Sequence, residues 1–360
     1  MVDEERIRRL RKWKKGEKQP PFELEIRPTD NCNLSCRTCP QSDVEPDNEV
    51  SDHTWRKVAS QLESFNIAEL TVCGGGEPLT RKDTVLKLLE ASKKSGASGR
   101  LITNGTLFEK RDIKKFIDMG WDTIMFSVNA PDASTDNFLR NSEEAFQKSI
   151  SSIKTFQIMK RRLDSQKPGI VLAPVLSNKN HRKILEFIEL AKNLGVESVI
   201  FQLLQKNTEF CDKIALKDSD MKTLRENIEK ASERAQEFGI NFNGEKFLDE
   251  KTVKKTSEKS ELIESDLKKT ENDGFTERPC FSPWSYMVIN PNGLAQPCPN
   301  LGEERGDEDI RNKSLKEIWH SEYFSKFRER IANSELFSCC DKCCGNKIFD
   351  VREARKELSK

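Results

Sequence analysis

Short apolar or β-branched runs alternate with longer amphipathic segments over about residues 22–240. The six runs are FELEIRP, ELTVC, RLITN, TIMFSV, GIVLAPV and SVIFQLL. The segments between them have helical period, as in residues 52–65, which follow a cap at Ser51. Six strand-helix units in series predict an α/β fold with a parallel sheet. Periodicity alone leaves open whether that sheet is doubly wound or closes toward a barrel.

Four motifs lie at the carboxyl ends of predicted strands. A cysteine cluster follows the first strand, CGGGEP closes the second, TNGT the third and SVNAPD the fourth. Parallel α/β sheets bind ligands at this edge, whether they are open or closed. We therefore expect the functional site there.

The first of these motifs, TDNCNLSCRTCPQ, contains the three thiols of Cys32, Cys36 and Cys39. A disulfide uses two thiols, and a structural zinc site usually has four ligands. Soft thiolates also suit iron-sulfur clusters. Three thiolates on a four-iron cube leave one iron open, which predicts that a small molecule binds there.

Composition restricts the other classes of function. Lys and Arg number 61 against 60 Asp and Glu, and this net charge of +1 argues against nucleic-acid binding by bulk electrostatics. The basic runs RIRRLRKWKK and KRR leave a local patch open, although we expect solvated helix faces. We find no apolar run of about 18 residues and no signal-peptide core, so we expect a cytoplasmic protein without a membrane span. Eleven cysteines in such a chain favour metal or redox chemistry over disulfides.

The strand-helix alternation stops near residue 243. Residues 247–278 are charged and rich in Ser and Thr, which predicts a linker. WSYMVINPNGLAQPC then predicts a hairpin that turns at 290–293, and SLKEIW predicts a helix with a capping box at Ser314 and Glu317. The expected parts are a charged N-terminal extension (1–19), a core (20–243), a linker (244–278), a small cysteine-rich domain (279–348) and a C-terminal tail (349–360).

Cys32, Cys36 and Cys39 match the CxxxCxxC motif of the radical S-adenosylmethionine (radical SAM) superfamily, and GGEP at 75–78 resembles that family's second motif. The chain resembles the family over about residues 20–243. The resemblance implies a partial (β/α)6 TIM-like barrel whose open iron binds the amino nitrogen and carboxylate of S-adenosylmethionine. It also implies reductive cleavage to methionine and a 5'-deoxyadenosyl radical, which abstracts hydrogen from a substrate.

The resemblance also suggests which residues contact this cofactor. Glycines allow backbone to approach a ligand closely, and several polar residues resemble those that hold the ribose or the methionine carboxylate. Turn or capping roles stay open for these polar residues. Thr38 stands where the family commonly has an aromatic residue, which leaves the packing around the adenine open. The candidates are Gly74, Gly75, Gly76, Glu77, Pro78, Asn104, Ser127, Asn129, Arg140 and Gln202.

The cysteines of the C-terminal domain resemble the auxiliary-cluster region of SPASM and twitch domains. Position 349 is Phe where a complete SPASM domain has a further cysteine, so the twitch version, with one auxiliary 4Fe-4S cluster, fits better. Neighbouring Cys339 and Cys344 allow other ligand pairs, and structural zinc is the alternative metal. The implied ligands are Cys280, Cys298, Cys340 and Cys343.

Two further cysteines stand alone. Cys73 precedes the glycines and Cys211 follows the sixth strand, so either could donate a hydrogen atom to a substrate radical, as a cysteine does in some radical SAM epimerases. Both could equally be small buried apolar residues. We expect no metal or general-base role for the three histidines, with His53 and His181 solvated.

The implied function is oxidation or epimerisation of a small polar molecule, carbohydrate-like or cyclitol-like, with help from an auxiliary cluster. A flavodoxin-type or ferredoxin-type protein would supply electrons. One alternative is modification of a peptide or protein side chain, the common work of SPASM enzymes. Another is a non-catalytic iron-sulfur or zinc protein for binding or electron transfer.

Overall fold

The main feature of the fold, seen in a computed structural model, is a nine-stranded sheet. The structure describes residues 3–40, 48–206, 208–248, 274–301, 306–338, 340 and 351–360. The strand order is β11-β10-β1-β2-β3-β4-β5-β7-β9. A separate two-stranded sheet pairs β6 with β8. The strands are β1 (Glu23–Ile26), β2 (Glu69–Val72), β3 (Ser98–Thr103), β4 (Thr123–Phe126), β5 (Gly169–Leu172), β6 (Val175–Leu176), β7 (Ser198–Val199), β8 (Gln202–Leu203), β9 (Asn241–Phe242), β10 (Tyr286–Ile289) and β11 (Ala295–Gln296).

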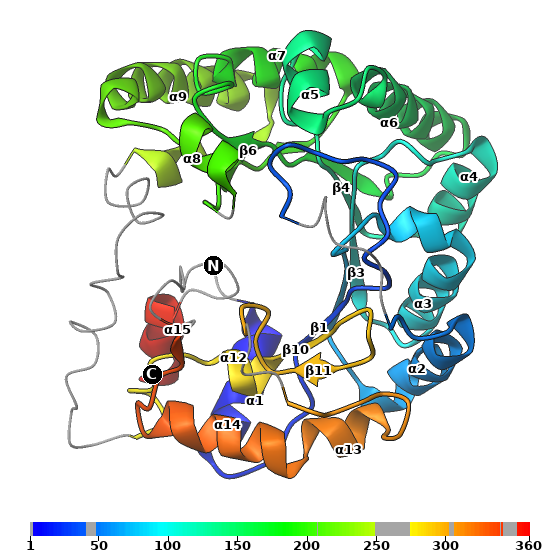
Figure 1. Ribbon diagram of the computed structural model, residues 1–360, viewed down its shortest axis with the longest axis vertical. Coiled ribbons are helices and arrows are strands. Elements are labelled where there is room, and N and C mark those ends of the chain that lie inside the picture. Colours follow the sequence, from blue (N-terminus) through cyan, green and yellow to red (C-terminus); the bar gives the residue numbers. More distant parts are fainter. Residues whose placement is uncertain are drawn as a thin grey trace.

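The order of the strands decides between the two α/β architectures. From β1 to β9 the main sheet takes its strands in chain order and pairs them in parallel. A doubly wound sheet would reverse this order at a switch point. Figure 1 shows the sheet curving as an arc with helices on its outer side. The partial TIM-like barrel implied by the resemblance is confirmed.

The helices that cover the barrel begin and end largely where the sequence signals predict. In α2 the Ser51 hydroxyl accepts a hydrogen bond from the Thr54 amide at 3.3 Å, and Asn66 ends the helix in a left-handed conformation. Gly195, also left-handed, ends α7. These helices are α2 (Asp52–Phe65), α3 (Lys82–Lys94), α4 (Lys110–Asp118), α5 (Ala133–Arg140), α6 (Ala145–Arg162), α7 (Ile184–Leu194), α8 (Glu209–Ile214) and α9 (Asp218–Phe238), with 3-10 turns η1 (Pro78–Arg81) and η2 (Gly244–Phe247).

Strand side chains alternate between the helices and the barrel interior. Leu24 and Ile26 of β1, with Leu70 and Val72 of β2, are fully buried in the core beneath the helices. The intervening positions face the inside of the barrel and carry much of its polarity. Because β1 to β4 pair in parallel, their carboxyl ends lie together at one edge of the sheet.

The C-terminal domain continues the barrel sheet. Strand β10 pairs in parallel with β1, with Tyr286 opposite Glu23, and β11 returns antiparallel to β10. The predicted hairpin is confirmed: Gly293 has a φ of +85°, and its amide donates to the Asn290 carbonyl at 2.9 Å. The predicted capping box starts α13, since the Ser314 amide donates to Glu317 at 2.7 Å. The domain's helices are α12 (Ser282–Ser285), α13 (Leu315–Trp319), α14 (Glu322–Ala332) and α15 (Val351–Leu358).

The two ends of the chain pack together in this domain. Helix α1 (Glu4–Lys14) contacts α12 and α15. Ile7 and Leu10 of α1 share one buried core with Ala354 and Leu358 of α15. The N-terminal segment therefore belongs to the C-terminal core. Residues 249–273, most of the expected linker, lie outside the described residues.

Two expectations about polar residues change. His181 is only 2% exposed, so the expectation that it is solvated is wrong. In the basic run of α1, Arg6 and Arg9 are buried while Arg8 and Arg11 are exposed, so that run is solvated on one face only. Within the described residues, no helix is long and apolar enough to cross a membrane.

Replacing Leu10 with Ala tests whether α1 is part of the fold. Leu10 is fully buried, so we expect a loss of about 2–5 kcal/mol in the free energy of unfolding. Urea denaturation followed by circular dichroism measures it. The matched change Arg8→Ala alters an exposed residue of the same helix and should leave the midpoint nearly unchanged. Equal effects of the two changes would contradict the packing of α1.

Candidate functional site

The three N-terminal cysteines lie together in the loop after β1. The Cys39 amide donates to the Cys36 carbonyl at 3.0 Å. Cys32 is exposed, and the other two thiols are half-buried. Burial raises the pKa of the Cys36 thiol to about 12, with Arg140 opposing the shift and the charges of Cys32 and Cys39 adding to it. The three thiols therefore stand on one loop, in which a backbone hydrogen bond joins Cys36 to Cys39.

Helices α5 and α8 hold the cysteine loop from outside. The Arg37 side chain donates to the Phe138 carbonyl at 3.0 Å and lies over the Phe138 ring at 4.8 Å. Cys211 is fully buried, and its thiol donates to the Thr38 carbonyl at 3.5 Å. The thiol of Cys211 therefore helps to hold Thr38, the residue before Cys39, in place. Its role as a hydrogen-atom donor stays a prediction.

The glycine loop after β2 packs directly on the cysteine loop. The amides of Gly76 and Glu77 donate to the carbonyls of Thr29 and Asn31 at 3.0 and 2.9 Å. A Cβ atom on Gly76 would lie 2.1 Å from the Asn31 carbonyl oxygen. Glycine is therefore required here by contact with the cysteine loop. The predicted contacts of Gly74, Gly75, Gly76 and Pro78 with the cofactor stay predictions.

Glu77 joins the ends of β2 and β3. Its buried carboxylate accepts hydrogen bonds from the Leu79 amide at 3.0 Å, the Thr103 hydroxyl at 2.7 Å and the Asn104 amide at 2.6 Å. Burial raises its pKa, and these hydrogen bonds oppose the shift. Both oxygens are thus engaged with the protein, which gives Glu77 a clear positioning role.

Asn104 lies beside the first cysteine. Its Nδ2 donates to Asn33 Oδ1 at 2.9 Å and lies 4.0 Å from Cys32 Sγ. Since Glu77 binds the Asn104 amide, the second and third motifs together fix the surroundings of Cys32. In the sequence, the only indication that Asn104 lies near Cys32 was the position of TNGT directly after the third predicted strand.

A buried ion pair between Arg140 and Asp136 contacts the Asn104 loop. Arg140, 1% exposed, pairs with Asp136 at 3.2 Å and donates to the Asn104 carbonyl at 2.7 Å. Asp136 accepts from the Asn129 amide at 2.6 Å, and the Asn129 side chain accepts from Val175 at 3.0 Å. Burial raises the pKa of Asp136, and Arg140 opposes this. The described contacts of Arg140 and Asn129 are therefore internal.

The two other polar candidates are more accessible. Ser127 is half-buried at the end of β4, and Gln202 is exposed on β8. The backbone amide of Gln202 donates to the Pro174 carbonyl at 2.9 Å, and the Gln202 side chain takes no part in this hydrogen bond. Both stay predicted cofactor contacts.

Sequence reasoning named Cys73 but missed the charged and polar residues beside it, with which it forms what we call the lumen cluster: Glu25, Arg27, Cys73 and Tyr286. Arg27 Nε donates to Glu25 at 2.6 Å, and the Tyr286 hydroxyl donates to the second Glu25 oxygen. Burial raises the pKa of the Cys73 thiol well above its usual value, with Glu25 adding to the shift and Arg27 opposing it. The signal was present in FELEIRP, whose charged residues alternate with apolar ones.

The described C-terminal cysteines pack against a second apolar core. Cys280, Cys298 and Cys340 are half-buried and pack against the same apolar core as α1 and α15. The Ser282 amide donates to Cys280 Sγ at 3.3 Å. Cys343, the fourth predicted ligand, lies outside the described residues, as do Cys339 and Cys344.

Comparison with known families identifies this arrangement. The family model described as the Radical SAM superfamily matches residues 26–215, more than half of the chain. The chain belongs to the radical SAM superfamily. A second model, SPASM, described as an iron-sulfur cluster-binding domain, matches residues 280–344. The protein is therefore a radical SAM enzyme that uses a 4Fe-4S cluster and S-adenosylmethionine. Its SPASM domain binds auxiliary iron-sulfur clusters.

Curated relatives cover most of this radical SAM chain. An AdoMet-dependent heme synthase of Methanosarcina barkeri is 24% identical over 91% of the chain and 89% of its own length. A protein of Pyrococcus furiosus that modifies the cofactor of tungsten-containing aldehyde ferredoxin oxidoreductase is 24% identical over 89% and 86%. A probable GTP 3',8-cyclase of Saccharolobus islandicus is 29% identical over 61% and 68%.

Solved structures share the fold. SuiB of Streptococcus suis bound to S-adenosylmethionine has a TM-score of 0.65 at 19% identity, covering 90% of this chain and 72% of SuiB. The anSMEcpe enzyme with bound AdoMet has a TM-score of 0.61 at 16% identity, covering 94% and 96%. At these identities the likeness concerns the fold alone.

The arrangement of the cysteines suits a cluster. Within the described residues, no three His, Cys, Asp or Glu side chains converge on one metal ion. A single zinc ion would hold every sulfur at about 2.3 Å, whereas each thiolate of a cluster binds a different iron. Soft thiolates are the usual ligands of iron-sulfur clusters, so by the chemistry of its donors the loop of Cys32, Cys36 and Cys39 fits the family's cluster.

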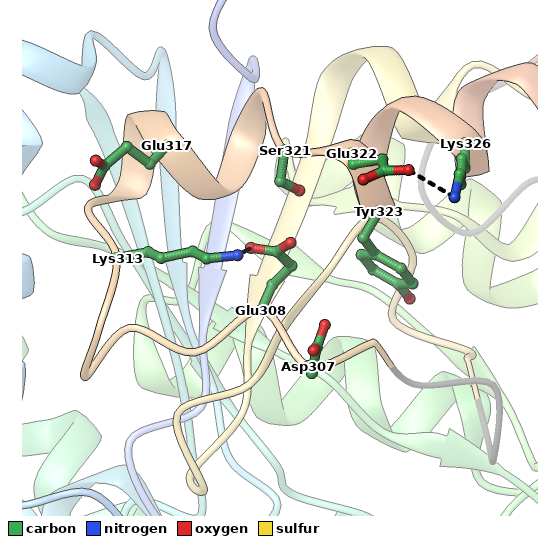
Figure 2. A pocket seen from close by; sticks show the side chains of 8 residues that line it. All are labelled: Asp307, Glu308, Lys313, Glu317, Ser321, Glu322, Tyr323 and Lys326. Atoms are coloured by element: carbon green, nitrogen blue, oxygen red, sulfur yellow. Dashed lines mark hydrogen bonds and ion pairs between the residues drawn. The ribbon is translucent and has the colours of Figure 1, made fainter.

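A surface pocket lies elsewhere, on the C-terminal domain between the loop before α13 and helices α13 and α14 (Figure 2). Its charged residues pair with one another: Lys313 with Glu308 at 2.9 Å and Lys326 with Glu322 at 2.7 Å. Among the predicted site residues that the structure describes, none lines it. We assign it no part in the site.

Replacing Gly76 with Ala tests the contact between the two loops. The added Cβ meets backbone that cannot move aside freely, so we expect a loss of about 1–3 kcal/mol in the free energy of unfolding and incomplete cluster assembly at the N-terminal site. Iron content after anaerobic reconstitution and the unfolding midpoint measure these effects. Gly274→Ala is the matched control, because a Cβ there meets no atom within 4 Å. Full iron content in the Gly76 variant would contradict the contact.

Proposed function

We propose that this radical SAM enzyme oxidises or epimerises a small polar molecule, of a carbohydrate-like or cyclitol-like class, with the help of an auxiliary cluster. The lumen cluster carries this proposal. TIM-type barrels usually fill their interior with bulky branched side chains. Here the carboxylate of Glu25, the guanidinium of Arg27 and the hydroxyl of Tyr286 meet inside the barrel.

The charge of the lumen cluster suits a polar substrate. Burying charged groups is costly unless they are paired and hydrogen-bonded. Arg27 is paired with Glu25 yet its side chain remains 25% exposed, so its guanidinium can also bind a polar group of a substrate. An apolar substrate would cover the exposed part of the Arg27 guanidinium without offering it a hydrogen-bond acceptor.

Cys32, Cys36 and Cys39 would hold the cluster that binds S-adenosylmethionine. When bound and reduced, that cluster supplies the electron that cleaves the sulfonium bond to methionine and a 5'-deoxyadenosyl radical. Asn104 and Glu77 orient the surroundings of Cys32, and Ser127 and Gln202 remain accessible for polar contacts with the cofactor.

Cys280, Cys298 and Cys340 would hold one auxiliary 4Fe-4S cluster, with Cys343 as the fourth ligand. Three of these thiols already face one apolar core, which shields a cluster from water. One auxiliary cluster provides a place for the electron that leaves an oxidised substrate radical.

Cys73 is the better hydrogen-atom donor of the two lone cysteines. A donor must keep its S–H bond, and burial beside Glu25 keeps the Cys73 thiol protonated by raising its pKa. Cys211 is instead engaged with the cysteine loop. An epimerisation would require such a donor; an oxidation would not.

Peptide side-chain modification is the second candidate. SuiB has been solved with its precursor peptide SuiA, and anSMEcpe with the Kp18Cys peptide. These structures share the fold with this chain, whereas the lumen cluster favours a small polar substrate. Because the chain is a radical SAM enzyme, the non-catalytic alternative is not retained.

The electron donor would be a flavodoxin-type or ferredoxin-type protein. We place the protein in the cytoplasm, where the cysteines that would bind the clusters stay reduced.

Anaerobic reconstitution tests the cofactor assignment. We expect about eight irons per chain and formation of 5'-deoxyadenosine with dithionite. The variant with Cys32, Cys36 and Cys39 replaced by Ala should retain about four irons and form no 5'-deoxyadenosine. A variant with Cys280 and Cys298 replaced by Ala should lose only the auxiliary cluster. Unchanged cleavage in the first variant would refute the assignment.

Replacing Arg27 with Gln tests the lumen cluster. Loss of a charged contact worth about 2 kcal/mol raises the substrate KM about 30-fold, while substrate-free cleavage of S-adenosylmethionine stays near wild type. Deuterium transfer into 5'-deoxyadenosine from labelled cyclitols, sugars and peptides identifies the substrate and supplies the assay. Arg27→Lys, which keeps the charge, should recover part of the affinity. Equal KM values for wild type and Arg27→Gln would exclude Arg27 from substrate binding.

A further inference from the structure

We propose that the outer face of α1, with the adjoining end of α15, is a docking surface for an acidic protein electron carrier that exchanges electrons with the auxiliary cluster. We call it the α1/α15 basic face, and its exposed residues are Arg8, Arg11, Lys14, Lys15, Lys18 and Lys356. The proposal rests on the auxiliary cluster proposed above.

Positive charge is concentrated at the two ends of the chain. Residues 3–18 contain eight Lys or Arg against four Asp or Glu, and residues 351–360 contain four against two. These segments hold an excess of six positive charges in a chain whose net charge is +1, so the remainder has an excess of five negative charges. Because α1 packs on α15, both basic segments lie on one side of the C-terminal domain.

Part of this charge is unpaired within the described residues. Arg11 and Lys14 donate to backbone carbonyls of Glu357 and Leu358 at 2.8 and 3.2 Å, which fixes them at the end of α15. Arg8 pairs with Glu5. Within the described residues, Lys15 and Lys18 are exposed and belong to no ion pair.

The α1/α15 basic face lies one helix away from the auxiliary cysteines. The opposite face of α1 buries Ile7 and Leu10 in the core against which Cys280, Cys298 and Cys340 pack. An α-helix with its side chains is about 10–12 Å across. Helix α1 also contacts α12, which begins two residues after Cys280, so a carrier on the outer face of α1 would lie beside a segment that carries a proposed cluster ligand.

Charge complementarity identifies the occupant. A basic face steers an acidic partner and raises its association rate. One electron passes in each encounter: a reduced carrier is oxidised as it reduces the cluster, and an oxidised carrier is reduced as it removes the electron that the cluster has accepted from a substrate radical. Nucleic acids and anionic membranes also bind basic faces, but they give no reason for a position beside the cluster ligands.

Stopped-flow reduction tests the surface without requiring S-adenosylmethionine cleavage. The full-length variant with Cys32, Cys36 and Cys39 replaced by Ala contains only the auxiliary cluster, whose absorbance bleaches on reduction. Reduced flavodoxin is the probe. In this background, Lys15→Glu with Lys18→Glu should lower the second-order rate constant about tenfold at low ionic strength. The difference should nearly vanish at about 1 M salt, where the Debye length is about 3 Å.

The controls separate docking from damage to the cluster. Lys222→Glu with Lys230→Glu makes the same charge change on exposed residues of α9 and should leave the rate constant unchanged. Reduction by dithionite and iron content should be the same in all variants. Equal flavodoxin rates in the α1 and α9 variants would overturn the proposal. So would tighter binding of the wild-type chain to phosphatidylserine vesicles or duplex DNA than to flavodoxin.

Discussion

Contact between two backbone loops is the constraint on which the site depends. The glycine loop after β2 lies against the cysteine loop after β1, at a distance that leaves no room for a Cβ on Gly76. Glu77, the next residue, then binds the amide of Asn104 and the hydroxyl of Thr103. Three consecutive strand ends are thereby fixed to one another, and the thiols take their positions from this frame.

The barrel combines an apolar exterior with a charged interior. One set of strand residues packs beneath the helices, while Glu25, Arg27 and Tyr286 meet on the other side. Tyr286 comes from the C-terminal domain, between the two cysteines Cys280 and Cys298. The lumen cluster and the C-terminal cysteines Cys280 and Cys298 are therefore connected by a single strand, β10.

The C-terminal domain is held by burial of aromatic and cationic groups. Arg328 is buried, and its side chain donates to the carbonyls of Pro283 and Trp319 at 2.8 and 3.0 Å while lying over the Trp319 ring at 4.4 Å. Burial lowers the pKa of Arg328 to about 9, so it stays charged at neutral pH. Trp319 in turn donates to the Gln19 carbonyl at 2.7 Å, which joins the domain to the segment before β1. The cluster-binding domain and the N-terminal segment thus form one packed unit.

The sequence by itself determined the local features: the strand-helix alternation, the caps at Ser51 and Ser314, the hairpin turn at Gly293 and the spacing of the cysteines. These depend on periodicity and on the chemistry of neighbouring residues, which are visible in one dimension. Only the tertiary structure decided that β10 joins β1, that α1 packs on α15 and that Glu25 meets Tyr286. Each of these pairings joins residues that are far apart in the sequence. Their partners are selected by packing and by charge, which no local sequence pattern encodes.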